Sequence, residues 1–127
     1  MQYQFLLDTN IVLWLAEDKP RIDQIKPLLL TTGSDVFVSV VSWWEIAIKM
    51  RTGKLAVDLE QIRSYAEEHA FVELPVTSAY MKAYLELPAL HKDPFDHMLL
   101  AQAISTPMHL ITGDSFLADY SSLVMVV

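Results

Sequence analysis

Four acidic residues, Asp8, Glu45, Asp96 and Asp114, stand at positions in this sequence where a carboxylate could do chemistry. Asp8 directly follows the apolar run 5–7, and Asp114 comes shortly after a second apolar run. In open α/β sheets, ligands bind outside the carboxyl ends of the strands, near the point where the strand order reverses. We therefore expect Asp8 and Asp114 to lie at the same edge of a sheet.

Glu45 lies within a helical pattern and shares a helix face with Val41 and Ile48. A solvated glutamate would normally face away from such neighbours, because burial of an unpaired carboxylate costs several kcal/mol. Two explanations stay open at this point. Either Glu45 belongs to a functional site, which we favour, or it forms a structural ion pair with Lys49 four residues on.

Asp93 and Asp96 bracket the start of another predicted helix. Asp93 precedes Pro94, as an N-cap residue precedes a proline in the first helical turn, and we interpret Asp93 mainly as a cap. Asp96 also aligns with the apolar stripe of Leu99, Leu100 and Ala103, which should face the sheet. An acid on an inward stripe indicates a site. Asp8 and Asp114 also have a simpler interpretation as helix caps.

Carboxylates gathered in one pocket repel each other, so either some of them bind protons or a cation lies among them. The sequence has no cysteine, and its histidines do not follow a zinc-site spacing. Hard oxygen ligands favour Mg²⁺ or Mn²⁺ over zinc. The acids therefore predict a magnesium or manganese site.

The elements that position these acids follow from hydrophobic periodicity. Short apolar runs alternate with longer helical patterns, which is typical of βαβ units. Strands are predicted at 3–8, 36–38, 71–74, 109–112 and 123–127, and helices at 11–16, 21–30, 42–51, from 58 onward, 77–87 and 94–105. Thr9 or Asn10 should cap the first helix, and Ser39 or Ser42 the third. We expect an α/β fold with a central parallel sheet of four or five strands and helices on both faces, and a single domain over residues 1–127.

Composition narrows the class of protein further. The longest apolar runs span about half a dozen residues, against roughly 20 for a membrane-spanning helix, and the first residues do not resemble a signal peptide. We expect a cytoplasmic protein without membrane association. The absence of cysteine excludes disulfides and a cysteine nucleophile.

The net charge of −7, from sixteen acids and nine bases, argues against broad binding of nucleic acid through a basic surface. Several bases nevertheless cluster near the candidate acids and could make local phosphate contacts: Lys49, Arg51, Lys54, Lys92 and His97. If a nucleic acid binds this protein, we therefore expect recognition of a particular shape rather than indiscriminate binding.

Four segments carry a resemblance to a known family: FLLDTN at 5–10, SWWEIAIK at 42–49, DPFDHMLLAQA at 93–103 and TGD at 112–114. In this order they resemble PIN-domain proteins, and more narrowly the VapC toxins of bacterial toxin–antitoxin pairs. The resemblance covers the whole chain. It implies that Asp8, Glu45, Asp96 and Asp114 are the catalytic acids, with supporting polar groups at Thr9, Asn10, Ser42 and Thr112.

The resemblance also implies an activity and partners. VapC-type proteins are Mg²⁺- or Mn²⁺-dependent ribonucleases that cut structured RNA, often tRNA or ribosomal RNA. They form homodimers and are inhibited by a small DNA-binding antitoxin, VapB.

Three other classes of protein are alternatives to this interpretation. An aspartate-dependent phosphatase of the haloacid dehalogenase type needs a second aspartate where Asn10 stands. A receiver-like signalling domain needs paired acids after the first strand and a lysine after a late strand, and no lysine follows Lys92. A PIN-like domain kept only for binding is the non-enzymatic alternative, and loss of one of the four acids would favour it.

Overall fold

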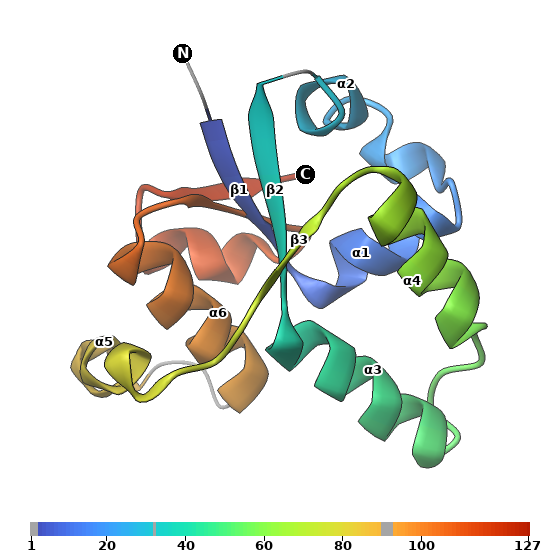
Figure 1. The fold of residues 1–127 in the computed structure, drawn as a ribbon. Coiled ribbons are helices and arrows are strands. Elements are labelled where there is room, and N and C mark those ends of the chain that lie inside the picture. Colours follow the sequence, from blue (N-terminus) through green and yellow to red (C-terminus); the bar gives the residue numbers. More distant parts are fainter. Residues whose placement is uncertain (1–2, 32, 90–92) are drawn as a thin grey trace.

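The structure of the chain is a computed structural model that describes residues 3–31, 33–89 and 93–127. These residues form five strands and six α-helices, with two helices between most successive strands and three short 3₁₀ turns (Figure 1). The strands are β1 (Tyr3–Leu7), β2 (Ser34–Ser39), β3 (Val72–Leu74), β4 (His109–Thr112) and β5 (Val124–Val126). The helices are α1 (Thr9–Ala16), α2 (Lys26–Leu29), α3 (Val40–Arg51), α4 (Leu59–Glu68), α5 (Met81–Glu86) and α6 (Pro94–Ser105).

All five strands are parallel and form one sheet in the order β3-β2-β1-β4-β5, which confirms the predicted architecture. β1 lies in the centre, with Leu7 opposite Val38 of β2 and Ile111 of β4. The chain builds outward from β1 through β2 and β3, then crosses to the other side of β1 for β4 and β5. The strand order therefore reverses between β1 and β4, where α/β sheets bind their ligands.

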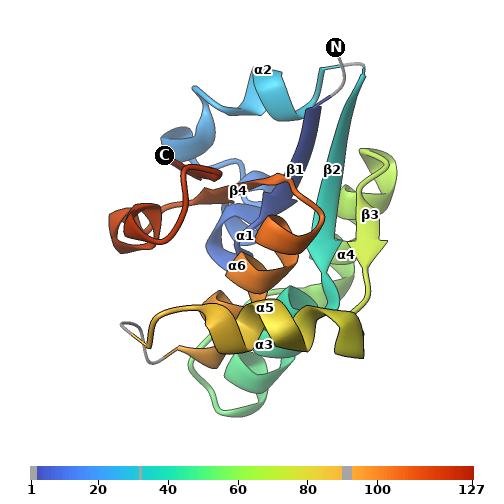
Figure 2. The same ribbon diagram turned by 90° about the vertical axis from the view of Figure 1, so that its left-hand side faces the viewer.

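Side chains of the sheet pack into two separate cores. Phe5 and Leu7 point to one face, against Ile11 of α1 and Ile62 of α4. Leu6, between them, points to the other face, where the buried side chains of α6 meet the sheet: Leu99, Leu100 and Ala103. Successive residues of a strand point to opposite faces, so helices on both sides require β1 to be apolar throughout. Figure 2 shows α5 and α6 on one side of β1 and β2, with α4 on the other.

Five helical segments within the described residues begin with a side-chain cap, and one of these caps is Asp58 at the start of α4. The 3₁₀ turn Ser115–Asp119 follows β4 and is capped by Asp114, while Ser39 caps α3 and Asp93 caps α6. Asp8 is the N-cap of α1, with its Oδ1 accepting a hydrogen bond from the Thr9 amide at 2.7 Å. The prediction that Thr9 or Asn10 caps this helix was wrong. Asp8 has the extended backbone of an N-cap residue, and its side chain and carbonyl accept hydrogen bonds from amides of the first helical turn.

The predicted helix at 21–30 was also wrong. The chain forms a 3₁₀ turn at Pro20–Ile22 and then the four-residue helix α2. Pro27 lies in the first turn of α2, where its missing N–H has no consequence. Within a continuous helix the same proline would remove a backbone hydrogen bond and clash with the preceding turn. The segment at 77–87 is helical as predicted, with a 3₁₀ first turn at Ser78–Tyr80 before α5.

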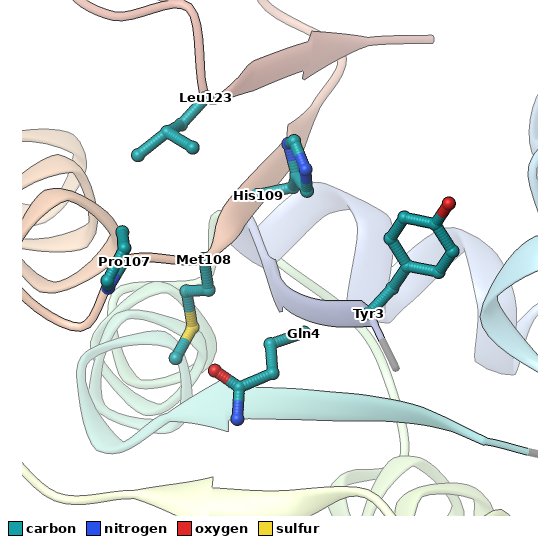
Figure 3. Close-up of a pocket in the computed structure, with 6 residues that line it drawn as sticks. All are labelled: Tyr3, Gln4, Pro107, Met108, His109 and Leu123. Carbon is teal, nitrogen blue, oxygen red and sulfur yellow. The ribbon is translucent and has the colours of Figure 1, made fainter. Parts of the chain in front are cut away.

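A cavity of about 360 Å³ opens at the amino edge of the sheet, away from the predicted acids. Tyr3 and Gln4 come from the start of β1, and His109 from the start of β4 (Figure 3). The other lining residues are Pro107, Met108 and Leu123. None of these residues was predicted to form a site. In the described part of the chain, no helix has the length and apolar character needed to cross a bilayer.

Candidate active site

The candidate site lies at the carboxyl edge of the sheet, where β1 and β4 end side by side. Asp8 is 6% exposed, and its Oδ2 accepts a hydrogen bond from Oγ1 of Thr112 at 2.6 Å. The backbone amide of Asp8 also donates to the carbonyl of Ile111, which pins the end of β1 to β4. Burial raises the pKa of the Asp8 carboxyl, whereas the hydrogen bonds from Thr112 and the Thr9 amide lower it. Thr112 and Thr9 therefore hold Asp8 in one orientation.

A second set of contacts joins α1 to α3. The hydroxyl of Thr9 donates to Oε1 of Glu45 at 2.6 Å and lies 3.0 Å from Oγ of Ser42. Thr9, Ser42 and Glu45 are all buried. On the outer side, Oε2 of Glu45 pairs with Nζ of Lys49 at 2.8 Å. The ion pair between Glu45 and Lys49, one of the two alternatives for Glu45, is therefore present, and it lies within the predicted site.

The ion pair with Glu45 changes the pKa of Lys49. The hydrogen bond to Glu45 raises the pKa of Lys49, and the charges of Asp93 and Asp96 act in the same direction. Lys49 was predicted as an RNA contact. In this structure its ammonium group instead pairs with the buried Glu45 carboxylate of the cluster.

Asp114 is tied to the same network through Thr112. The amide of Asp114 donates to Oγ1 of Thr112 at 3.0 Å, so this hydroxyl bridges the backbone of Asp114 and the carboxylate of Asp8. Oδ1 of Asp114 accepts from the amide of Phe116 as the cap of the next turn. Capping and site geometry are therefore one arrangement: the turn after β4 both caps a helix and completes a chain of polar contacts from Asp114 to Glu45.

The start of α6 brings the remaining acids to this edge. Asp93 accepts hydrogen bonds from the amides of Phe95 and Asp96, which confirms its role as a cap. Asp96 is half-buried, and burial together with the charges of Asp8, Asp93, Glu45 and Asp114 raises its pKa to about 8. All four predicted acids thus lie close enough to act on one another, although they come from four separate segments of the chain.

The donor set suits a hard divalent cation, because every candidate ligand is a carboxylate. Burial raises the pKa of Asp8 and of Asp96, and the charges of neighbouring carboxylates raise both further, so a cation among them would favour their ionised forms. The side chains do not converge on one point as they stand: within residues 3–31, 33–89 and 93–127, no three acidic or histidine side chains form a group that could hold a metal ion. Metal binding would therefore require small side-chain rotations.

The predicted RNA contacts are distributed unevenly. Arg51 and Lys54 are exposed at the end of α3 and beyond it. The ring of His97 contacts Tyr84 of α5 and Tyr120, with centroids 5.7 and 5.9 Å apart, so it has a packing role in this structure. Asn10 is exposed on the first turn of α1. Lys92 lies outside the described residues.

An apolar groove borders the acids between α3, α5 and α6. Trp44 is 62% exposed on its rim, and the ring packs edge-on against Phe95 at 5.4 Å. Trp43, the other member of the adjacent pair, packs against the core. The lining is almost entirely apolar: Val40, Val41, Trp44, Val76, Met81, Tyr84, Pro94, Phe95 and Met98.

Arg21 and Gly113 interact beside the site, and neither was predicted as a site residue from the sequence. Nη2 of Arg21 donates to the carbonyl of Gly113 at 3.0 Å, and its guanidinium lies over the ring of Trp14. Arg21 and Gly113 are 92 positions apart. No local pattern in the sequence pairs residues so far apart.

Comparisons with known proteins agree with this geometry. The family model of the PIN domain matches residues 5–123. A chain of VapBC2 from Rickettsia felis, solved with a promoter DNA fragment, aligns with a TM-score of 0.70 and 16% identity over 98% of this chain and 97% of its own. A chain of DNA-bound VapBC from Salmonella typhimurium gives a TM-score of 0.69 and 16% identity, covering 99% and 98%. A chain of VapBC-1 from nontypeable Haemophilus influenzae gives 0.66 and 21%, covering 97% of each.

No curated protein matches the sequence significantly. The structural neighbours have low identity and support the fold, whereas the family match spans nearly the whole chain and includes all four acids. The haloacid dehalogenase and receiver alternatives are thereby set aside. This chain belongs to the PIN-domain family.

Proposed function

We propose that this protein is a metal-dependent endoribonuclease, the VapC-type toxin of a VapBC-like toxin–antitoxin pair. The observation that carries the proposal is the network of hydrogen bonds at the switch point of the sheet, which joins Asp8 to Asp114 through Thr112 and joins Glu45 to Thr9. Asp96 lies near enough for the charges of the other acids to raise its pKa. The PIN-domain match supports the nuclease class. In this proposal residues 1–127 act as one PIN domain in the cytoplasm.

Asp8, Asp96 and Asp114 would hold Mg²⁺ or Mn²⁺. A divalent ion held there lowers the pKa of a bound water and offsets charge that develops on the phosphoryl oxygens. Thr112 fixes Oδ2 of Asp8, which leaves the position of this ligand defined before any cation binds.

Glu45 would orient the attacking water and accept its proton. Its Oε1 accepts a hydrogen bond from Thr9 and its Oε2 pairs with Lys49, so the orientation of the carboxylate is fixed from both sides. As a proton reaches Glu45, the Lys49 contact weakens and the ammonium becomes free to face the phosphate. The expected products carry 3′-hydroxyl and 5′-phosphate ends, and the expected substrates are structured RNAs such as tRNA or ribosomal RNA.

The proposed partners are a VapB-type antitoxin and a second copy of this chain. Support comes from the structural neighbours, which were solved as VapBC complexes. The apolar groove beside the acids, with Trp44 exposed on its rim, offers an apolar contact surface close to a negative pocket. An antitoxin segment that combines apolar side chains with an arginine would complement both.

The proposal is tested by RNA cleavage with purified protein and mapping of the new 5′ ends. Asp8→Asn and Asp96→Asn should each abolish cleavage while the fold survives, and EDTA should abolish it in the wild type. Asp35→Asn, which removes one charge near the amino edge of β2, is the matched control and should cleave normally. Equal cleavage by all variants, or cleavage unaffected by EDTA, would contradict the metal mechanism. Intact RNA under all conditions would favour a PIN domain kept only for binding.

A further inference from the structure

The turn at Thr112, Gly113 and Asp114 supplies two of the four polar links of the site. Thr112 donates to Asp8, and the Asp114 amide donates back to Thr112. A displacement of this turn relative to β1 would break the bond from Thr112 to Asp8, since hydrogen bonds weaken steeply with distance. The turn therefore needs a support of its own.

Gly113 is the point at which that support acts. A Cβ atom added to Gly113 would lie 2.6 Å from Cη2 and 2.9 Å from Cζ3 of Trp14, and 3.1 Å from Nη2 of Arg21. Real side-chain carbons essentially never approach so closely. Glycine is therefore required here by close packing, with the indole ring and the guanidinium pressed against the backbone of the turn.

Arg21 adds a directed bond to this contact. Its Nη2 donates to the carbonyl of Gly113 at 3.0 Å and lies 3.5 Å from the carbonyl of Val127 beyond β5. The guanidinium carbon lies 4.4 Å from the centroid of the Trp14 ring. Arginine presents planar donors that can stack on an aromatic face and still reach two acceptors, and lysine does not.

Trp14 connects the turn to the opposite side of the site. It lies on α1, the helix that begins with Thr9 and is capped by Asp8. The helix that carries Asp8 and Thr9 at one end thus carries, near its other end, the ring that packs against Gly113. Asp8 and Thr112 are held together both directly and through this second contact.

We infer that Arg21 and Trp14 are positioning residues that clamp the 112–114 turn, and so set Thr112 and Asp114 relative to Asp8 for cation binding. The inference rests on the proposed function only in its last step, the binding of a cation. Neither residue touches the reacting atoms in this assignment. Their effect passes through the carbonyl of Gly113 and the packing beneath it.

The test compares Arg21→Gln with Arg63→Gln in the full-length protein. Arg63 is an exposed arginine of α4 that pairs with Glu60 at 3.2 Å, so this control removes the same charge far from the turn. Two quantities are measured: the hydrogen-exchange rate of the Asp114 amide in metal-free protein, and the dissociation constant for Mn²⁺. Melting temperature serves as the measure of global stability.

Arg21→Gln should speed exchange of the Asp114 amide about tenfold and weaken Mn²⁺ binding about tenfold, because local opening of the turn becomes easier. Arg63→Gln should change both by less than about twofold, as expected of an exposed ion pair. Arg21→Lys should resemble Arg21→Gln in both measurements, since a retained charge alone cannot replace the stacked donor.

Exchange of the Asp114 amide in Arg21→Gln at the wild-type rate would overturn the inference. So would an acceleration that affects amides throughout the sheet equally and accompanies a lower melting temperature, because that pattern reports global destabilisation. A wild-type protein that fails to bind Mn²⁺ contradicts the proposed function instead, and the exchange rate still decides whether Arg21 positions the turn.

Discussion

The two sides of the candidate site manage buried negative charge in different ways. On the side of α1 and α3, Asp8 and Glu45 accept hydrogen bonds from threonine hydroxyls, and Lys49 supplies a positive charge. On the side of α6, the pKa of Asp96 rises to about 8 under the combined effect of burial and four neighbouring acids. The first side is a frame held by hydrogen bonds and one ion pair, and the second is the place where protonation would respond to a bound cation.

This difference indicates how a protein with net charge −7 keeps a carboxylate cluster folded. In the folded protein, Asp8 accepts a hydrogen bond from Thr112, and Glu45 has Thr9 and Lys49 as partners. Asp96 can instead retain a proton near neutral pH, which removes one repulsive charge at no cost in contacts. A divalent cation would displace that proton, so cation binding and the proton on Asp96 compete directly.

The largest expected effect comes from removing a hydroxyl of the frame. Thr9→Val keeps the shape of the side chain but removes the donor to Glu45, leaving a buried carboxylate short of a hydrogen bond. We expect a loss of about 2–3 kcal/mol in the free energy of unfolding, measured by urea denaturation at pH 7. Thr9→Ser retains the hydroxyl and should lose less than about 1 kcal/mol. Equal losses in both variants would show that packing, and not the hydrogen bond, is what matters at this position.

The next effect concerns the α6 side and depends on pH. The pKa of Asp96 is raised in the folded protein, from 3.8 to about 8. In the absence of divalent ions, the proton on Asp96 therefore stabilises the fold fully below about pH 4, and this contribution declines between about pH 4 and pH 8. Asp96→Asn cannot ionise, so its free energy of unfolding should exceed that of the wild type by about 1–2 kcal/mol at pH 8, a value discounted for solvent screening of a half-buried group.

The measurement for Asp96 is a series of urea denaturations between pH 4 and pH 8. The Asn variant and the wild type should coincide near pH 4 and diverge as the pH rises. Asp35→Asn should keep the wild-type pH dependence. If Asp96→Asn is no more stable than the wild type at pH 8, the pKa of Asp96 is not raised in the folded protein.

The smallest expected effect is that of Lys49→Met. Loss of the ammonium leaves Glu45 buried with only Thr9 as its remaining hydrogen-bond donor among these contacts. Because Lys49 is itself partly exposed, we expect a loss of about 1 kcal/mol at pH 7. Lys19→Met, which removes an exposed pair with Glu17 at 3.4 Å, should lose less than about 0.5 kcal/mol. Equal losses in the two variants would mean that the Glu45–Lys49 pair behaves as a surface ion pair.

Local patterns in the sequence were sufficient for the strands and for the four acids. Each acid follows an apolar run or sits on an inward helix stripe, and both features are readable within a few residues. The apolar spacing predicts a helix at 21–30, but Pro27 is compatible only with the first turn of a helix, so the continuous helix does not form. The first helix begins at Thr9, two residues before its predicted start at Ile11, because several residues that can cap a helix follow one another there.

The connections between segments could not be predicted. Thr9 reaches Glu45 across 36 positions, and Arg21 reaches Gly113 across 92. Such pairs depend on the order of strands in the sheet and on the angle at which α1 and α3 leave it, neither of which a single sequence encodes locally. For the same reason the sequence offered an ion pair or a functional site for Glu45 as alternatives, whereas the structure places the ion pair within the candidate site.

The most direct test of the central claim is a calorimetric titration of the purified protein with Mn²⁺ at pH 8. Wild type and Asp35→Asn should show the same saturable binding, because the cation is held at the carboxyl edge of the sheet and not at its amino edge. Asp8→Asn should lose this binding while retaining the wild-type circular dichroism spectrum. Equal Mn²⁺ affinity in wild type and Asp8→Asn would contradict the assignment of these acids to a metal-dependent site.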